Sequence, residues 1–526
     1  MKRFLDTAVV ALVLGTGACG ASDEASTTQP GSETPAAAAQ APLAEQVSID
    51  DISVYQAVKA QIVKEGAPSA KLNAPVIANR PAVIRVFVKA ITTARPTVEG
   101  ELVLKTPGKP DVVVRDGGKR IVNELDDDEL ATTLNFNVPA EAIQAGTTYS
   151  FRVASGKLDG ATDVVSFPAD GSAAPLGAKT SSQVLRVKFV PVTLDDAGTE
   201  RAADMANVQM YKDTLYKMYP VASVEVSVRE QAFKWPEAVE ASGRGWDKLL
   251  TGIMQLRRAD ASPQNVYYVG VFNPKSSLEE FCSKGGCVLG IAPQASERDV
   301  NMRVALVLGY GNRGAGGTLA QELAHAMGRW HAPCGNPDAI DDDYPYGNAS
   351  IGVEGYDILD KKWYSPGSRL KDFMSYCSPT WVSDYTYNGL FERMDLVEQQ
   401  EQERAKSGGT ATGTGTGTGT AGGRETQVMQ TFLVDKDGKV EPGPELDAIP
   451  PPNGANSADG AKDETIAITY EGAASKTLGS AKGVIRRIAG TGGRIVVAPA
   501  APKAALRARL TGLGVTALRS ASLTGR

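Results

Sequence analysis

Histidine is almost missing from this chain of 526 residues, because it occurs only twice, at His325 and His331. The chain also has no cluster of basic residues, and its formal net charge of −6 is spread along the sequence. This distribution gives nucleic-acid binding no support. Beyond the N-terminal segment no apolar stretch is long enough to cross a bilayer, so we expect no membrane-spanning helix. The informative features are therefore the N-terminus, the few cysteines and the neighbourhood of the two histidines.

The N-terminus has the organisation of a secretory signal. Lys2 and Arg3 form a positive segment, Ala8 to Leu14 form a short apolar segment, and small residues follow. The run Thr16-Gly17-Ala18-Cys19 resembles a bacterial lipobox, which predicts a signal peptide at 1–18 and lipidation of Cys19. The alternative is ordinary secretion with cleavage near the same residues. In both cases we expect an exported protein, lipid-anchored at the cell envelope (the outer membrane if the source is Gram-negative) or extracellular.

Two segments that cannot build a core divide the remaining chain. Residues 19–46 are rich in Ala, Ser, Thr, Pro and Glu, and predict a flexible tether for the lipoprotein. Residues 407–425 contain a Gly-Thr repeat and predict a linker. The length suggests about three domains. We place them at 47–181, 182–406 and 426–526, because the pattern changes from strands to mixed α/β at about Ser182.

The patterns within these three regions predict a multidomain fold. Residues 47–181 contain short, often alternating β-branched stretches between Gly, Pro and Asp clusters, which predict an Ig-like β-sandwich. Residues 182–406 alternate between strand and helix patterns, with helices expected at Thr199–Met218 and Trp246–Ala259, and predict a central α/β domain. Residues 426–526 show weaker strand patterns and predict a small C-terminal β domain.

Four cysteines remain if Cys19 carries a lipid: Cys282, Cys287, Cys334 and Cys377. An even number in an exported protein favours disulfides. The close spacing of Cys282 and Cys287 suits a local bridge, which leaves Cys334 to pair with Cys377. The alternatives are free thiols or a metal site of four thiolates.

Both histidines lie in the window Q-E-x-x-H-x-x-G-x-x-H, which runs from Gln321 to His331. On a helix, positions 321 and 325 are one turn apart on one face, so both side chains can reach one metal ion. Gly328 permits the positive φ of a sharp turn, which brings His331 back toward the same point. Glu322 stands where a carboxylate can take a proton from water activated by the metal.

This window resembles the zinc-binding motif of the metzincin peptidases, with Gln321 in place of the first His. It is also similar to a group of secreted bacterial metallopeptidases whose motif continues as His-Ala-Pro-Cys-Gly, as residues 331–335 do here. The downstream run Asp372-Phe373-Met374-Ser375-Tyr376-Cys377 resembles the methionine turn of metzincins, with Met374 beneath the metal. Tyr376 has the spacing of a Tyr that binds the metal or stabilises the transition state in some members. The resemblance covers about Ser182 to Lys406 and implies a metzincin-like catalytic domain, in which a Cys334–Cys377 bridge ties the His331 loop to the methionine turn.

The resemblance also implies an activity, which is zinc-dependent hydrolysis of peptide bonds at the cell surface. One zinc ion is expected at His325, His331 and Gln321, with Glu322 as general base and Tyr376 as a donor to the oxyanion. The expected partner is a protein or glycoprotein substrate. We expect a monomer with no nucleic-acid partner and no membrane contact except through the lipid.

Gln321 leaves three interpretations open, because an amide oxygen is a much poorer zinc ligand than an imidazole. In the first, the two histidines hold zinc with Gln321 or Tyr376, and activity survives at a reduced level. In the second, the chain is a pseudopeptidase that binds protein or glycan without cutting. In the third, Gln321 is structural and forms a capping box with Thr318 at the start of the helix.

A run of acidic residues follows the window, at Asp338, Asp341, Asp342 and Asp343. Carboxylates in such a run can bind calcium together with backbone carbonyls. A solvated loop is the more common structure for such a run, so calcium is the weaker expectation.

Overall fold

The computed structural model of the chain describes residues 42–180, 184–196, 199–311, 314–406, 419–421, 424–449, 463–511 and 519–522. The expected signal peptide (1–18), Cys19 and the expected tether as far as residue 41 lie outside these residues. Of the expected linker (407–425), residues 407–418 and 422–423 lie outside them, whereas residues 419–421 and 424–425 belong to strands.

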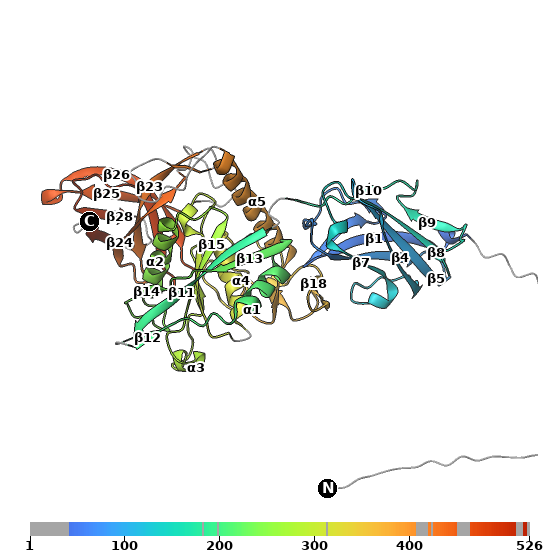
Figure 1. Cartoon of the computed structure of the whole chain (residues 1–526), viewed down its shortest axis with the longest axis horizontal. Helices are drawn as coiled ribbons and strands as arrows, with labels where there is room; N and C mark the ends of the chain where they lie inside the picture. The colour runs from blue at the N-terminus through green and yellow to red at the C-terminus, as the bar shows by residue number, and fades with distance from the viewer. Residues whose placement is uncertain are drawn as a thin grey trace, which may run out of the picture. The chain divides into compact units, whose positions relative to one another are not determined.

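The N-terminal region is built from two antiparallel sheets (Figure 1). The first has the order β3-β2-β1-β4-β7, made by β1 (Val47–Tyr55), β2 (Lys59–Lys64), β3 (Ala67–Pro68), β4 (Ala82–Ala90) and β7 (Leu134–Val138). The second has the order β10-β8-β5-β6, with β9 beside β8, made by β5 (Thr97–Lys105), β6 (Val112–Arg120), β8 (Thr148–Ser155), β9 (Val164–Phe167) and β10 (Ala174–Pro175). Side chains that alternate inward along these strands, such as Ile84, Leu102 and Phe151, are buried in a common core.

A seven-stranded mixed sheet follows, with the order β12-β11-β15-β17-β16 and with β13 and β14 also paired to β11. Its strands are β11 (Val184–Asp196), β12 (Thr199–Arg201), β13 (Ser223–Val228), β14 (Phe233–Trp235), β15 (Val266–Phe272), β16 (Gly290–Ile291) and β17 (Val304–Leu308). The inner strands β11, β15 and β17 run parallel, whereas β16 pairs with β17 in the antiparallel direction at the end of the sheet.

Helices lie on both faces of this sheet because successive side chains of each strand point to opposite sides. Val187 and Phe189 share a core with α1 (Val208–Met218) and α4 (Ala315–Ala326). Val190 and Val192 share a separate core with α2 (Trp246–Ala259) on the opposite face. The sheet therefore separates the helix that carries the histidine window from α2.

The segments that follow α4 are mostly irregular. They contain the short strand pairs β18 (Gly355–Asp357) with β19 (Lys362–Tyr364), and β20 (Lys371–Asp372) with β21 (Thr380–Trp381). The remaining helices are α3 (Leu278–Phe281) and the long α5 (Asp384–Lys406).

The C-terminal region forms an eight-stranded antiparallel sheet with the order β22-β23-β27-β26-β25-β28-β29, in which β24 also pairs with β23. Its strands are β22 (Gly419–Ala421), β23 (Arg424–Val434), β24 (Val440–Ala448), β25 (Thr465–Glu471), β26 (Thr477–Arg487), β27 (Arg494–Pro499), β28 (Arg507–Thr511) and β29 (Arg519–Ser522). Met429, Leu433 and Ile495 of this sheet lie in the same core as Trp246 of α2. The C-terminal sheet and the mixed sheet therefore pack together around α2.

The expectation of a central α/β metzincin-like catalytic domain is wrong. Strands account for 39% and helices for 19% of the structure, with only five helices and several sheets in the described part of the chain. One reason is that the segment Thr199–Met218, expected to be helical throughout, starts with β12 and becomes helical only at Val208. Another is that much of the region between α4 and α5 forms turns and very short strands, while the C-terminal region contributes a whole further sheet.

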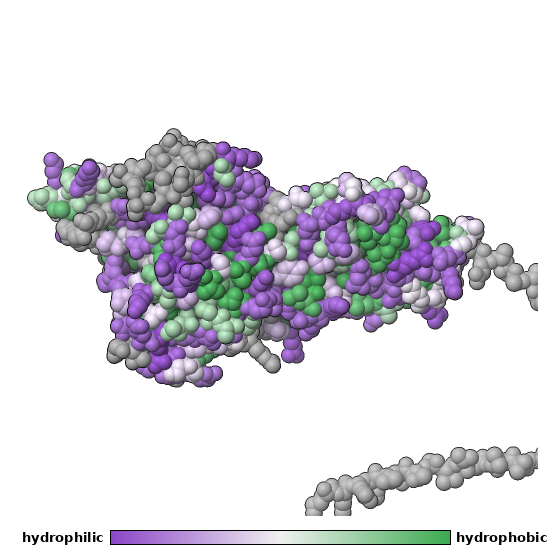
Figure 2. Space-filling model, viewed as in Figure 1, coloured by the Kyte–Doolittle hydropathy of each residue, from purple (hydrophilic) through white to green (hydrophobic). Residues whose placement is uncertain are grey.

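The surface agrees with a fold in which apolar side chains are mainly buried. On the face shown in Figure 2, hydrophobic residues form separate patches among hydrophilic ones. None of the described helices is long and apolar enough to cross a membrane.

Candidate metal and peptide site

The first part of the histidine window lies on α4, which follows β17 along the chain. Leu319 and Leu323 face the core of the mixed sheet and anchor the helix. Glu322 is 7% exposed and His325 is fully buried. Packing of Leu319 and Leu323 therefore fixes the helix that carries Glu322 and His325.

Gly328 turns the chain directly after α4. Its φ of +83° is a conformation that favours glycine, and a Cβ at this position would lie 2.5 Å from Arg393 Nη2. The Gly328 amide donates to the carbonyl of His325 at 2.7 Å. The chain reverses its direction at this glycine, so the side chain of His331 lies next to that of His325.

The two imidazoles meet through their Nε2 atoms, which lie 3.1 Å apart. The Nδ1 atom of His325 lies 2.8 Å from the carbonyl oxygen of Arg329, and that of His331 lies within hydrogen-bond distance of the carbonyl oxygen of Asp338. Because a carbonyl oxygen only accepts, each Nδ1 must carry the ring proton and each Nε2 exposes a lone pair. Two lone pairs at this distance repel each other unless a proton or a metal cation lies between them.

Burial disfavours a proton between the two Nε2 atoms, because it disfavours the charged form of either imidazole. Burial lowers the pKa of His325 well below its usual value, with a further contribution from His331. Burial also lowers the pKa of His331. A metal cation satisfies both lone pairs, and carbonyls behind the distal nitrogens are the usual support of histidine ligands. The donor set of these two residues therefore fits zinc.

Glu322 is a buried carboxylate beside this pair of histidines in the sequence. Its Oε2 atom has no hydrogen-bond partner. Burial, and to a smaller degree the charge of Asp338, raises the pKa of Glu322 well above its usual value. A carboxyl group beside a site of hydrolysis is of the kind that transfers protons as a general acid or base.

Gln321 is not part of a capping box, so that expectation is wrong. The helix begins at Ala315, and Thr318 lies inside it with its hydroxyl donating to the carbonyl of Gly314 at 3.2 Å. The side-chain amide nitrogen of Gln321 is buried without a hydrogen-bond partner. Within the described ranges, no group of three or more His, Cys, Asp or Glu side chains is arranged to hold a metal ion. The structure thus brings His325 and His331 together, and among the described residues no third His, Cys, Asp or Glu side chain joins them.

Met374 connects to the histidine loop through the backbone. Its side chain is 1% exposed, and its carbonyl accepts a hydrogen bond from the amide of Ala332 at 3.0 Å. The amide of Met374 donates to the buried Asp372 at 2.7 Å. The turn at Met374 therefore packs against the residue that follows His331.

Tyr376 lies against His331 on the solvent side. The two rings make an edge contact with centroids 4.8 Å apart, and Tyr376 remains 48% exposed. Its hydroxyl donates to Asp338 Oδ1 at 3.4 Å, a long and therefore weak hydrogen bond. Its partial burial, together with the charge of Asp338, raises the pKa of Tyr376, so the hydroxyl is protonated near neutral pH. An exposed phenol beside His331 is well placed to donate a hydrogen bond to a ligand.

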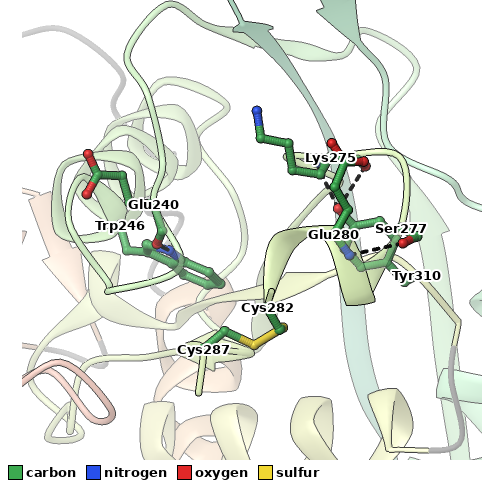
Figure 3. Close-up of a disulfide and its surroundings, with 8 residues drawn as sticks. All are labelled: Glu240, Trp246, Lys275, Ser277, Glu280, Cys282, Cys287 and Tyr310. Carbon is green, nitrogen blue, oxygen red and sulfur yellow. Dashed lines mark hydrogen bonds between the residues drawn. A yellow bond between two sulfur atoms is a disulfide. The ribbon is translucent and has the colours of Figure 1, made fainter. Parts of the chain in front are cut away.

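Both expected disulfides are present. Cys334–Cys377 links the His331 loop to the segment of Met374 and Tyr376, next to a hydrogen bond of 3.0 Å from the Tyr376 amide to the Cys334 carbonyl. Cys282–Cys287 closes a local loop (Figure 3). Disulfides are compatible with an extracellular protein.

The loop of Cys282–Cys287 leads directly into β16. In Figure 3 it lies near Trp246, whose indole nitrogen donates to the carbonyl of Glu240 at 2.9 Å. The amide of Val288, just after the bridge, donates to the carbonyl of Ala241 at 3.0 Å. The disulfide therefore helps to hold the segment that enters β16.

Asp338 was expected only as one residue of an acidic run, and its role beside the histidines was missed. It accepts from His331 through its carbonyl and from Tyr376 through its carboxylate. Asp341 contacts protein groups instead, pairing with Arg329 at 3.3 Å and accepting from the Tyr385 hydroxyl at 3.0 Å. No sequence spacing predicts these contacts, because they depend on how the loop after His331 folds back.

A cavity of about 450 Å³ lies elsewhere, between the loop before α2 and the turns of the C-terminal sheet. Its lining includes Glu237, Arg244, Lys248, Asp435 and Glu441, and none of the histidine-site residues. Charges of both signs line it, and several are already paired, as Lys248 is with Glu237 at 3.3 Å. The cavity is therefore separate from the candidate site.

Neither the models of known protein families nor the curated proteins contain a match to this chain.

Proposed function

We propose that the chain is a zinc-dependent peptidase of the cell surface, and that its substrate is a protein or glycoprotein. One observation carries this proposal. Two buried imidazoles present unprotonated Nε2 atoms to each other at 3.1 Å, with both Nδ1 atoms held by carbonyls. Glu322, on the same helix as His325, is the carboxyl group that would transfer the proton during hydrolysis.

His325 and His331 would hold the metal, with Gln321 or Tyr376 as the third protein ligand. Each of these two residues provides an oxygen, and both lie in the immediate sequence or spatial neighbourhood of the histidines. When bound by the two Nε2 atoms, zinc would act as a Lewis acid that activates water and polarises the carbonyl of the substrate. The resemblance to the metzincin motif supports the same assignment.

Glu322 would act as the general base of the reaction. It takes a proton from the attacking water and delivers that proton to the amine of the departing peptide. The hydroxyl of Tyr376 would donate a hydrogen bond to the oxygen that becomes negative as the carbonyl is attacked. Its weak hydrogen bond to Asp338 costs little to break.

The first experiment is elemental analysis of the protein purified without a histidine tag or a chelator. We expect about one zinc per chain, and a large loss of zinc in His325→Ala and in His331→Ala. The zinc-loaded protein should cleave a mixed peptide pool, and Glu322→Gln should retain zinc while cleaving nothing. A folded protein that binds no zinc would contradict the proposal.

A second candidate function is a binding protein for peptides or glycans that lacks catalysis. The observation that favours it is that the described residues offer no group of three His, Cys, Asp or Glu side chains for a metal. Gln321→His restores the usual ligand type and separates the two functions. Activity that appears only in Gln321→His would identify the natural chain as a pseudopeptidase.

We also propose that Cys19 carries a lipid and anchors the monomer at the envelope, with no other membrane contact. The lipobox-like sequence before Cys19 supports this. Mass spectrometry of the N-terminal peptide from membrane fractions should find a diacylglyceryl adduct on Cys19. Cys19→Ala should release the protein from the membrane fraction, and an unmodified Cys19 would contradict the proposal.

A further inference from the structure

The N-terminal β-sandwich is joined by backbone hydrogen bonds to the segment between α4 and α5. Residues 57–59 of the sandwich pair with residues 354–356, where β18 begins. An antiparallel bridge joins Val58 to Gly355, between backbone hydrogen bonds of 2.8 Å and 2.9 Å. The sandwich and the chain around the histidines also share one continuous core. The sandwich is therefore packed as a fixed neighbour of the histidine region, in contrast to a module on a flexible linker.

Trp381 connects this junction to the Met374 turn. Its indole nitrogen donates to the carbonyl of Ala57 in the sandwich at 2.8 Å, and its own carbonyl accepts from the amide of Phe373 at 2.8 Å. A Cβ on Gly355 would lie 2.5 Å from the indole, so only a glycine lets β18 pass this close to Trp381. The side chain is 4% exposed, so water cannot easily replace either bond. Trp381 therefore fixes the Met374 turn relative to the sandwich.

Tyr219 makes a second connection, to α4, the helix of the histidine window. Its hydroxyl donates to the carbonyl of Ala320 in α4 at 2.7 Å, and its ring stacks on that of Phe373 with centroids 6.2 Å apart. Tyr219 is fully buried, so no water can take the place of the hydroxyl. A carbonyl within a helix accepts one amide and has a second lone pair, which this hydroxyl uses. One side chain thus contacts both α4 and the residue before Met374.

Arg80 of the sandwich holds the end of α1 at which Tyr219 lies. Its buried guanidinium donates to three carbonyls, those of Lys217 at 3.2 Å, Tyr219 at 2.8 Å and Val221 at 2.6 Å. The last carbonyls of a helix have no partner within the helix, and a cation placed there is favourable. The same guanidinium donates to the carbonyl of Gln56 within the sandwich at 2.8 Å. A chain of contacts therefore runs from the sandwich through Arg80 and Tyr219 to α4.

We propose that the N-terminal β-sandwich is a part of the candidate site, which it positions through Tyr219 and Trp381. Tyr219 holds α4 at Ala320, two residues before Glu322, and Trp381 holds the Met374 turn. Both are positioning residues, because they act through the segments that they hold. The two imidazoles then meet in the geometry that a metal ion needs only while the sandwich is docked. The consequence for zinc rests on the proposed function, whereas the positions of α4 and of the turn can be tested without zinc.

The first test is the zinc affinity of the full chain, measured by competition with a chelating dye. Tyr219→Phe removes the donor to Ala320, and Trp381→Phe removes the donor to Ala57, while both keep an aromatic ring in the core. We expect each variant to bind zinc about tenfold more weakly, as is usual when the support of a metal ligand is removed. If the natural chain binds zinc, unchanged affinity in both variants would overturn the inference.

Two matched variants make the same chemical changes elsewhere. Tyr470→Phe removes a buried hydroxyl that donates to the Pro499 carbonyl at 3.0 Å, and Trp246→Phe removes a buried indole that donates to the Glu240 carbonyl at 2.9 Å. Both residues lie outside the core that the sandwich shares with α4. Denaturant titration should show similar losses of stability in all four variants, whereas only the first two should lose zinc affinity. Equal weakening of zinc binding in all four would overturn the inference, because it would follow from stability alone.

Hydrogen exchange provides a measurement that does not need zinc. The amides of α4 should exchange about tenfold faster in Tyr219→Phe, and those of residues 372–377 in Trp381→Phe, because each loses one buried hydrogen bond. The two matched variants should leave both segments unchanged. This pattern in a protein that binds no zinc would support the positioning role and contradict the proposed function alone. Unchanged exchange in both segments would overturn the inference, whatever the zinc content.

Discussion

At the scale of single residues, the chemistry depends on where protons and lone pairs are held. The carbonyls of Arg329 and Asp338 fix the ring protons of His325 and His331 on Nδ1. Both Nε2 atoms are left as acceptors in a region from which water is largely excluded. The buried carboxyl group of Glu322 lies on the same helix as His325.

Replacement of Glu322 by Gln should remove proton transfer without removing metal binding. We expect kcat to fall by about 10²–10⁴-fold, the usual contribution of a general base, with zinc content unchanged. Peptide hydrolysis and elemental analysis measure the two effects separately. Glu392→Gln on the exposed side of α5 serves as the control and should have full activity. Equal activity in both variants would mean that Glu322 is not the base.

Replacement of Gly328 by Ala should destabilise the protein. The positive φ of +83° and the predicted overlap with Arg393 and the Ala295 carbonyl should lower the free energy of unfolding by about 1–3 kcal/mol. Gly317→Ala is the control, because no atom lies within 4 Å of its Cβ and the site is inside α4. It should raise the free energy of unfolding by about 0.5–1 kcal/mol. Denaturant titration checks both signs, and a neutral Gly328→Ala would contradict the strain argument.

At the scale of elements, the histidine loop and the Met374 turn form one unit. Two backbone hydrogen bonds and the Cys334–Cys377 bridge connect them. The two bridged cysteines are 43 residues apart in the chain, so the bridge constrains a long loop of the unfolded state. By contrast, Cys282 and Cys287 are only 5 residues apart.

Removal of the two disulfides should therefore have unequal effects. Loop-closure entropy predicts a loss of about 4 kcal/mol for Cys334→Ser with Cys377→Ser, and about 2 kcal/mol for Cys282→Ser with Cys287→Ser. The first double variant should also bind zinc more weakly, because His331 loses its support. Denaturant titration and zinc titration measure these effects. Equal zinc affinity in both double variants would show that the bridge does not position the site.

At the scale of the whole molecule, one buried ion network joins the C-terminal sheet to the mixed sheet. Arg486 donates to Asp299, to Asp463 at 2.9 Å and to the Ser296 hydroxyl at 2.9 Å. Burial raises the pKa of Asp299, but the Arg486 charge and the Ser296 hydrogen bonds outweigh it, so the pKa is lowered overall. The interface is therefore held by a carboxylate that must stay ionised.

Acid should weaken this interface first. A carboxyl group whose pKa is lowered by folding stabilises the protein above its unfolded pKa of about 3.9, and this contribution is lost as the pH falls through the folded value. We expect the free energy of unfolding to decline below about pH 5, and less steeply in Asp299→Asn. Glu200→Gln, which alters an exposed pair with Lys234, is the control. Identical acid profiles for Asp299→Asn and the natural chain would contradict this role.

Local sequence was sufficient for features that depend on neighbouring residues. The sequence pattern of Trp246–Ala259 predicted a helix with the bounds that the structure has. Local spacing also predicted both disulfides and the return of His331 to His325. In each case, chain geometry over a few residues or the number of cysteines determines the outcome.

Tertiary structure alone decided the fold class and the surroundings of the site. The balance of strands over helices, the helical start at Val208 and the position of Thr318 inside α4 result from packing between distant segments, which local patterns do not report. The same reason applies to the contacts of Asp338 with His331 and Tyr376. It applies also to the hydrogen bond from Trp381 to Ala57, because 324 residues separate these partners and only the folded chain brings them together.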